Sequence, residues 1–163
     1  MTRALGAVII FLACATSVAQ ALDKSPRPLP LRAEDFPVAG LVEGMTSTDV
    51  RRVLGRPQSV STEDDFRDPG AKLVSWKYND IVVLLGSQNA VRGIWLKTPR
   101  VGTSRGLRVG DPVSRVELLY GTPSFRDGTI LEYAISEEQS LHVIRILVKA
   151  GVVNKIFLGW LLD

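Results

Sequence analysis

The sequence is poor in cysteine and histidine, the residues on which disulfide chemistry and most transition-metal sites depend. Cys14 is the only cysteine and His142 the only histidine among 163 residues. A single cysteine cannot form an internal disulfide, so the fold must be stabilised by its hydrophobic core. Without a nearby cysteine or second histidine, metal binding at His142 would need carboxylates as its only companions. We therefore predict no metal site and no cofactor.

The motifs of common enzymes are also missing. No serine stands in a nucleophile-elbow context, and no Gly-Lys loop that could cradle a phosphate is present. His142 could act as a general base only with a nucleophile and an orienting acid, and no motif marks either. The paired carboxylates at Glu137-Glu138 and Asp64-Asp65 lie in turn-like stretches and are expected to be solvated. We predict that the protein is not an enzyme and that His142 is a structural or surface histidine.

A long basic run is a third absence. The chain holds 20 Lys and Arg against 17 Asp and Glu, and Arg51-Arg52 is its longest basic run. Proteins that bind nucleic acid usually carry a basic stripe, so no nucleic-acid partner is predicted. Hydrophobic residues make up 45% and charged residues 23%, which is the composition of a globular protein.

The N-terminus has the pattern of a signal peptide over residues 1–21. A short positive region, Met1–Arg3, precedes the apolar stretch Ala4–Ala15, and Ala19-Gln20-Ala21 places small residues at a cleavage site. The apolar stretch is shorter than the roughly 20 residues of a membrane span. We expect export, with a periplasmic or outer-membrane-associated location.

Cys14 has two interpretations. Leu12-Ala13-Cys14 could be part of a bacterial lipobox, in which case the cysteine carries a lipid anchor and contact with a membrane is through that anchor alone. Alternatively, Cys14 is a small apolar residue that is lost with the signal peptide. Residues 22–37 follow and are interpreted as an extended linker, because the four prolines favour polyproline II: Pro26, Pro28, Pro30 and Pro37.

The stretch Gly40–Pro57 recurs without a gap at Gly106–Pro123. Four of the six identical pairs are glycine or proline, which set backbone shape rather than chemistry. The identical pairs are Gly40/Gly106, Leu41/Leu107, Gly44/Gly110, Val50/Val116, Gly55/Gly121 and Pro57/Pro123. The sequence therefore predicts two copies of one unit, at residues 38–98 and 99–163.

Each copy is expected to hold one short helix followed by an antiparallel meander. In the first, Thr46 and Asp49 form a capping box, and Gly55 ends the helix as a left-handed cap. The helix would bury Val50, Val53 and Leu54. Residues 61–72 are interpreted as an acidic, solvated loop. Strands are predicted at Leu73–Tyr78, Ile81–Leu85 and Ala90–Lys97.

In the second copy, Asp111 is the expected helix cap and Pro112 takes the first turn. The buried helix face would be Val116, Leu119 and Tyr120, and strands are predicted at Thr129–Ile135, Leu141–Lys149 and Val152–Trp160. The fold class is thus α+β, with two tandem repeats that each place a short helix on an antiparallel β-meander.

The first copy resembles the SmpA/OmlA (BamE-like) family. The matching residues are Gly44-Met45-Thr46, Val50, Leu54-Gly55-Arg56-Pro57 and Trp76-Lys77-Tyr78. The resemblance implies a small two-layer α+β fold, a lipid anchor or periplasmic location, and a scaffolding role in outer-membrane protein assembly without catalytic residues. The tandem arrangement is also similar to the secreted β-lactamase inhibitory proteins, in which two such units grip an enzyme with their sheets. Duplication is a departure from the outer-membrane assembly member.

Binding to a protein partner in the cell envelope is therefore the expected function, as a non-enzymatic scaffold module. The alternatives are a secreted or periplasmic inhibitor or sensor that binds an enzyme through its sheet faces, and an envelope hydrolase that uses His142. A helix layer would cover only one sheet face, and aromatic residues on the other face would suit a partner. The candidates are Trp76, Trp95, Phe125 and Trp160, although large apolar side chains also fill cores.

Overall fold

The computed structural model describes residues 30–65, 69–137 and 140–161, with the backbone alone at 136, 137, 140, 141, 160 and 161. Its elements are, in chain order, η1 (Ala33–Asp35), α1 (Ser47–Leu54), β1 (Ser59–Asp64), β2 (Lys72–Lys77), β3 (Ile81–Leu85), β4 (Val91–Leu96), α2 (Val113–Tyr120), β5 (Phe125–Asp127), β6 (Ile130–Glu137), β7 (Ser140–Lys149) and β8 (Val152–Leu161). The predicted α+β class is confirmed.

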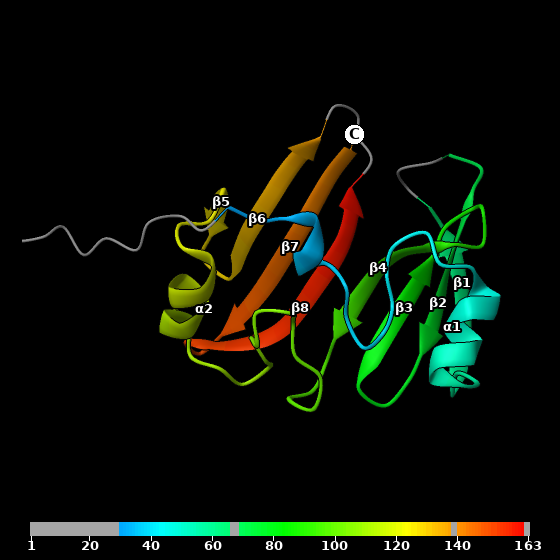
Figure 1. Ribbon diagram of the computed structural model, residues 1–163, viewed down its shortest axis with the longest axis horizontal. Helices are drawn as coiled ribbons and strands as arrows, with labels where there is room; N and C mark the ends of the chain where they lie inside the picture. The colour runs from blue at the N-terminus through cyan, green and yellow to red at the C-terminus, as the bar shows by residue number, and fades with distance from the viewer. Residues whose placement is uncertain (1–29, 66–68, 138–139, 162–163) are drawn as a thin grey trace, which may run out of the picture.

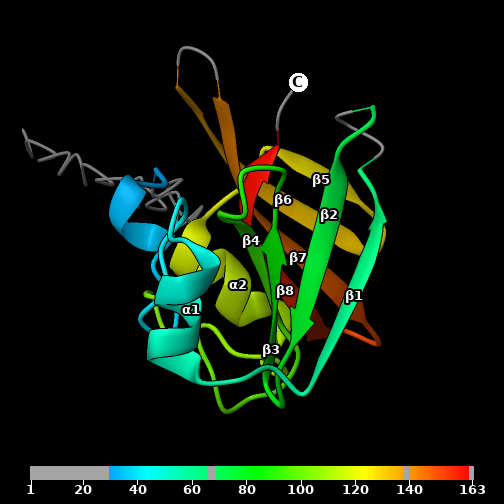
Figure 2. The same ribbon diagram turned by 90° about the vertical axis from the view of Figure 1, so that its right-hand side faces the viewer.

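All eight strands belong to one antiparallel sheet, in the order β1-β2-β3-β4-β8-β7-β6-β5 (Figure 1). The strands before α2 meet those after it where β4 pairs with β8, from Gly93↔Gly159 to Leu96↔Ile156. We call this ladder the seam. Figure 2 shows α1, α2 and η1 on one side of the sheet, so the other sheet face has no helix over it in the described part of the chain.

The core lies between the helices and the sheet. Leu41 and Leu107, which align in the recurring stretch, are both 0% exposed, and so are the aligned pair Val50 and Val116. Trp76 joins this core at 5% exposure. Because the same aligned positions are buried beside both helices, both copies of the stretch contribute to one core.

Helix α1 begins as the sequence predicts. The N–H of Asp49 donates to Thr46 Oγ1 at 3.3 Å, and the N–H of Thr46 donates to Asp49 Oδ2 at 3.1 Å. This capping box satisfies two N–H groups that the first helical turn would otherwise leave without partners.

We expect Thr46→Ala to lower the free energy of unfolding by about 1 kcal/mol, because it removes the side-chain acceptor of the cap. The measurement is urea unfolding followed by circular dichroism. Thr48→Ala is the control, since Thr48 is exposed on the same helix and its loss should change stability by less than about 0.5 kcal/mol. Equal effects of the two substitutions would contradict a stabilising cap.

Both helices end at a glycine held by a tyrosine. Gly55 has φ 77° and ψ −158°, and Gly121 has φ 74° and ψ −143°. The expected left-handed cap at Gly55 is therefore wrong in ψ, although its positive φ still favours glycine. The Tyr78 hydroxyl donates to the Gly55 carbonyl at 3.2 Å, and the Tyr133 hydroxyl to the Gly121 carbonyl at 3.1 Å. Each bond ties a helix end to the sheet.

Several expectations about the first half are wrong. Residues 59–64, placed partly in an acidic loop, form β1, an edge strand exposed at every position and paired with β2. Its polar sequence carries no hydrophobic alternation, because neither of its faces is buried. Val53, expected in the buried helix face, is 44% exposed. It lies beside Gly40, where an added Cβ would be 3.2 Å from Val53 Cγ1.

The second helix starts differently from the prediction. Pro112 is the N-cap, and no side chain caps it. The expected cap, Asp111, instead accepts from the N–H of Arg108 at 2.8 Å and pairs with Arg115 Nε at 3.2 Å. A further strand, β5, was not predicted because only Phe125–Asp127 form it.

Residues 30–37, the last part of the predicted linker, are folded against the body. We call them the strap. Asp35 is 5% exposed and pairs with Arg105, which follows the seam strand β4 in sequence. The prediction of an extended linker is wrong for these residues. It was based on proline content alone and did not consider that Asp35 could be buried in an ion pair.

Candidate functional site

A second apolar group lies on the sheet face opposite the helices. Trp95 of β4 stands between Val82 of β3 and Phe157 of β8. Neighbouring side chains on a strand point to opposite faces, and Ile94 and Leu158 belong to the core under the helices. Trp95 and Phe157 therefore point the other way. We define the open face by Val82, Leu84, Trp95, Val143 and Phe157.

Phe157 occupies the space of two missing side chains. A Cβ added to Gly93 would be 2.5 Å from the Phe157 ring, and one added to Gly159 would be 2.7 Å from it. Phe157 is consequently only 7% exposed, although no helix of the described residues lies on this side of the sheet. Its centroid lies 5.0 Å from that of Trp95, with 46° between the ring planes. An aromatic pair from both sides of the seam thus forms the centre of the open face.

Charged side chains border this apolar centre. Arg145 Nε donates to Glu132 Oε2 at 2.7 Å, and their side chains are 30% and 15% exposed. Phe125, on the edge strand β5, pairs with Glu132 and is 53% exposed. Aromatic residues and arginine around an apolar centre have the composition of protein-contact hot spots.

The four aromatic candidates do not form one site. Trp95 and Phe125 lie on the side of the sheet away from the helices, but Trp76 is a core residue on the helix side. The Arg51 guanidinium lies 4.9 Å from the centroid of the Trp76 ring and covers it. The Trp160 side chain lies outside the described residues, as does Cys14. Trp76 is therefore better explained by packing than by partner binding.

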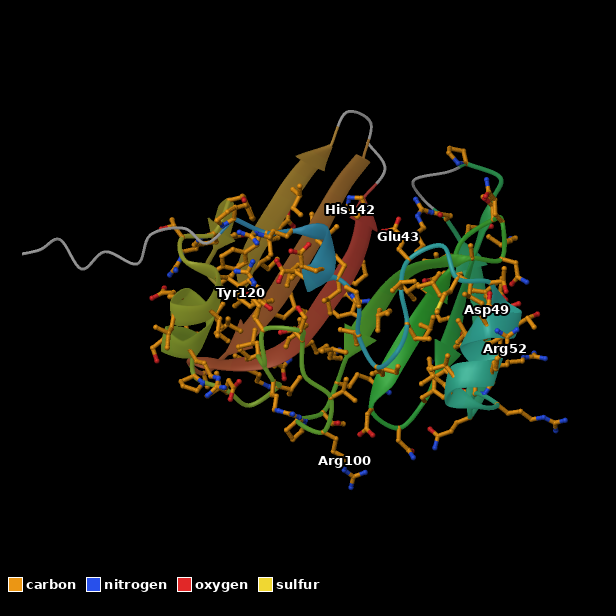
Figure 3. The ribbon with its side chains drawn as sticks, in the orientation of Figure 1. Glu43, Asp49, Arg52, Arg100, Tyr120 and His142 are labelled. Carbon is orange, nitrogen blue, oxygen red and sulfur yellow. The ribbon has the colours of Figure 1, made fainter. Side chains whose placement is uncertain are left out.

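His142 has an acidic neighbour that the sequence did not mark. Its Nε2 lies 3.0 Å from Glu43 Oε2, and the two side chains are 22% and 24% exposed (Figure 3). The Phe36 ring meets the imidazole edge-on, with centroids 5.4 Å apart. His142 and Glu43 are far apart in the chain, so no local motif could have shown the contact. The arrangement supplies the orienting carboxylate that a histidine general base requires.

Asp64 and Asp65 behave differently, although both were expected to be solvated. Asp64 is exposed and pairs with Lys72, whereas Asp65 is 4% exposed and pairs with Arg92. The buried pair connects the end of β1 to β4. Only the fold could reveal it, because adjacent carboxylates in a polar stretch look alike in sequence.

Among residues 30–65, 69–137 and 140–161, no helix combines the length and the apolar character that a membrane crossing requires. The same residues contain no group of three or more histidine, cysteine, aspartate or glutamate side chains placed to hold a metal ion.

Comparison with known proteins gives one distant similarity in fold. No protein-family model matches the sequence, and no curated protein matches it. The chain is similar to the crystal structure, at 1.5 Å resolution, of an extracellular protein containing an SCP domain from Bacillus anthracis str. Ames. The TM-score is 0.50 at 8% identity, over 71% of this chain and 43% of that one. The chain thus spans less than half of that protein, and the similarity concerns the fold alone.

Proposed function

We propose that the protein is an exported, non-enzymatic interaction module of the cell envelope that binds a protein partner through its open face. The observation that carries this proposal is the Trp95–Phe157 pair at the centre of a sheet face over which no described residues form a helix. The signal-peptide pattern at residues 1–21 supports export. The extracellular character of the Bacillus anthracis protein is in keeping with it.

We further propose that the chain arose as two copies of one helix-plus-meander unit of the SmpA/OmlA (BamE-like) type. Aligned residues make aligned hydrogen bonds, which supports this origin. The N–H of Gly44 donates to the Val91 carbonyl at 2.9 Å, and that of Gly110, its counterpart, to the Val153 carbonyl at 2.8 Å. The tyrosine bonds at the two helix ends correspond in the same way.

An inhibitor or sensor that binds an enzyme is the second candidate. The seam supports it, because it joins both halves into one continuous surface that a single partner could contact. The two candidates differ in what binds the open face. A scaffold would bind a component of the assembly machinery, whereas an inhibitor or sensor would bind a soluble enzyme. The His142–Glu43 pair is the only feature of the described site that favours a hydrolase.

Affinity purification of the tagged protein from native envelope extracts, followed by mass spectrometry, tests the open face. We expect Trp95→Ala to reduce recovery of the partner at least about tenfold, because truncating an aromatic hot spot typically costs 2 kcal/mol or more. Leu118→Ala is the matched control, since Leu118 is 73% exposed but belongs to α2 on the helix side.

Unchanged recovery with folded Trp95→Ala protein, or equal loss with Leu118→Ala, would refute the open face as the binding surface. Folding of each variant is checked by its circular dichroism and melting temperature. The identity of the recovered protein then separates the two candidates.

A further inference from the structure

A cavity of about 220 Å³ lies on the other side of the sheet from the open face, between the strap and the β6–β7 hairpin. Its described lining is apolar except for one acid and one imidazole: Ala33, Phe36, Pro37, Val42, Glu43, Ile135 and His142. Glu43 and His142 are both partly exposed, so their polar atoms can be reached. The cavity is somewhat smaller than the pockets that hold drug-sized ligands and would suit a small ligand or a single side chain.

The cavity forms where the two halves of the chain differ. Glu43 aligns with Val109, which packs against the core. The protein therefore has an apolar residue at this position in one half and an acid in the other. The Glu43 carboxylate lies 3.0 Å from His142 Nε2, so this half of the chain carries an acid–imidazole pair where the other half has an apolar residue aligned with Glu43.

The second difference is the length of the hairpin. Tyr78 and Tyr133 hold the two helix ends in the same way, which places them at corresponding points of the two meanders. The chain turns directly after Tyr78, whose N–H donates to the Ile81 carbonyl at 2.9 Å. After Tyr133 the ladder continues through Ile135↔His142. The extension carries both residues to the cavity and has no counterpart between β2 and β3.

We propose that this cavity binds a small organic cation with an apolar body. Glu43 is the only acid among its described lining residues, and an ammonium group can donate to a carboxylate in a charge-assisted hydrogen bond. The Phe36 ring beside His142 lines the same cavity, and with Val42 and Ile135 it would contact the apolar body of the ligand. An anion would meet the Glu43 carboxylate, and a neutral ligand would lack the charge-assisted bond.

The test uses phenethylamine as the probe, with 2-phenylethanol and 3-phenylpropionate as neutral and anionic controls of similar shape. Titrations of the full ¹⁵N-labelled chain are followed by two-dimensional NMR. We expect the amine to shift amide signals of residues 33–43 and 134–143 and to bind at least tenfold more tightly than either control. Equal binding of the three compounds, or shifts confined to other parts of the chain, would overturn the proposal.

Two substitutions sharpen this test. Glu43→Gln should weaken amine binding at least tenfold, and Ala33→Phe should abolish it by filling the cavity without altering the Glu43–His142 contact. Glu117→Gln, on α2, is the matched control and should bind as the unmodified protein does. Unchanged amine binding in either folded cavity variant would refute the assignment.

The cation could be a free amine or the lysine side chain of a protein. Adding N-acetyl-lysine methylamide to the titrations distinguishes the sources. Binding at least as tight as that of phenethylamine assigns the cavity to a lysine side chain, and weaker binding assigns it to a free aromatic amine. If the cavity binds no amine, the proposed function is unaffected, because the open face lies on the opposite side of the sheet.

Discussion

Replacing Gly159 with alanine is expected to lower the free energy of unfolding by about 3 kcal/mol or more, at the upper end of overpacking effects. The added Cβ would be 2.7 Å from the Arg92 carbonyl oxygen, from Gly93 Cα and from Phe157 Cζ. Two of these three atoms belong to the backbone of the neighbouring strand and cannot turn aside. Because Gly159 pairs directly with Gly93, relief of the clash would open the seam.

Gly93→Ala provides an instructive contrast. Its nearest clashes, at 2.5 and 2.7 Å, are with the Phe157 ring, and the closest backbone atom is the Leu158 carbonyl oxygen at 3.4 Å. In a Phe157→Val background, Gly93→Ala should therefore cost little, whereas Gly159→Ala should remain costly. Such dependence on a contacting residue is what a double-mutant cycle measures.

Urea unfolding followed by circular dichroism gives the required free energies. Gly86→Ala is the control: its added Cβ would be 3.4 Å from Arg92 Cδ, an ordinary van der Waals contact, and the change should stay within about 0.5 kcal/mol. A Gly159→Ala protein as stable as Gly86→Ala would show that the seam tolerates side chains. Rescue of Gly159→Ala by Phe157→Val would show that the ring, and not the backbone, is the obstacle.

The features that the sequence predicts correctly are those with local causes. The capping box at Thr46 and Asp49 and the apolar strand Ile81–Leu85 each depend on residues a few positions apart. The end of the first helix at Gly55 is local too, since its positive φ favours glycine. Local chemistry therefore defined both helices and most strands.

The missed features depend on contacts between distant residues. Edge strand β1 gains its hydrogen bonds from β2, and its exposed side chains give no periodic signal. The separation of Trp76 from Trp95 required knowledge of which sheet face the helices cover. The Glu43–His142 contact depends on the packing of a loop against β7. None of these could follow from spacing along the chain.

A second large loss of stability is expected when the ion pair that holds the strap is broken. Arg105 Nε donates to Asp35 Oδ1 at 2.7 Å, and its guanidinium also bonds the Pro30 and Leu119 carbonyls at 2.8 and 3.0 Å. The guanidinium carbon lies 5.0 Å from the centroid of the Tyr120 ring. The Asp35 and Arg105 side chains are 7% and 17% exposed, so removal of either leaves a charge that water reaches poorly.

We expect Asp35→Ala to lower the free energy of unfolding by about 3 kcal/mol, since loss of one partner from a buried pair usually costs 3–5 kcal/mol and Arg105 keeps some contact with water. Glu34→Ala is the neighbouring control: Glu34 is 72% exposed and 3.7 Å from Arg32, and such surface pairs contribute less than about 1 kcal/mol. The double variant Asp35→Leu/Arg105→Met should lose less than the sum of its single substitutions, because it removes both charges together. Additive losses would contradict a coupled pair.

The same pair predicts how stability changes with acid. Burial raises the pKa of Asp35, but hydrogen bonds from Arg105 and from the N–H of Arg32, with the Arg105 charge, outweigh it and hold the pKa below its ordinary value of 3.8. A carboxyl group whose pKa is lower in the folded state than in the unfolded state stabilises the fold at pH values above its unfolded-state pKa. This stabilisation is lost as the pH falls through the folded-state pKa.

The stability difference between the unmodified protein and Asp35→Asn should therefore be constant from pH 7 to about pH 5 and shrink below about pH 4. Urea midpoints measured across this range check the prediction. A difference that stays constant down to pH 2 would mean that the Asp35 carboxylate does not hold the strap through its charge.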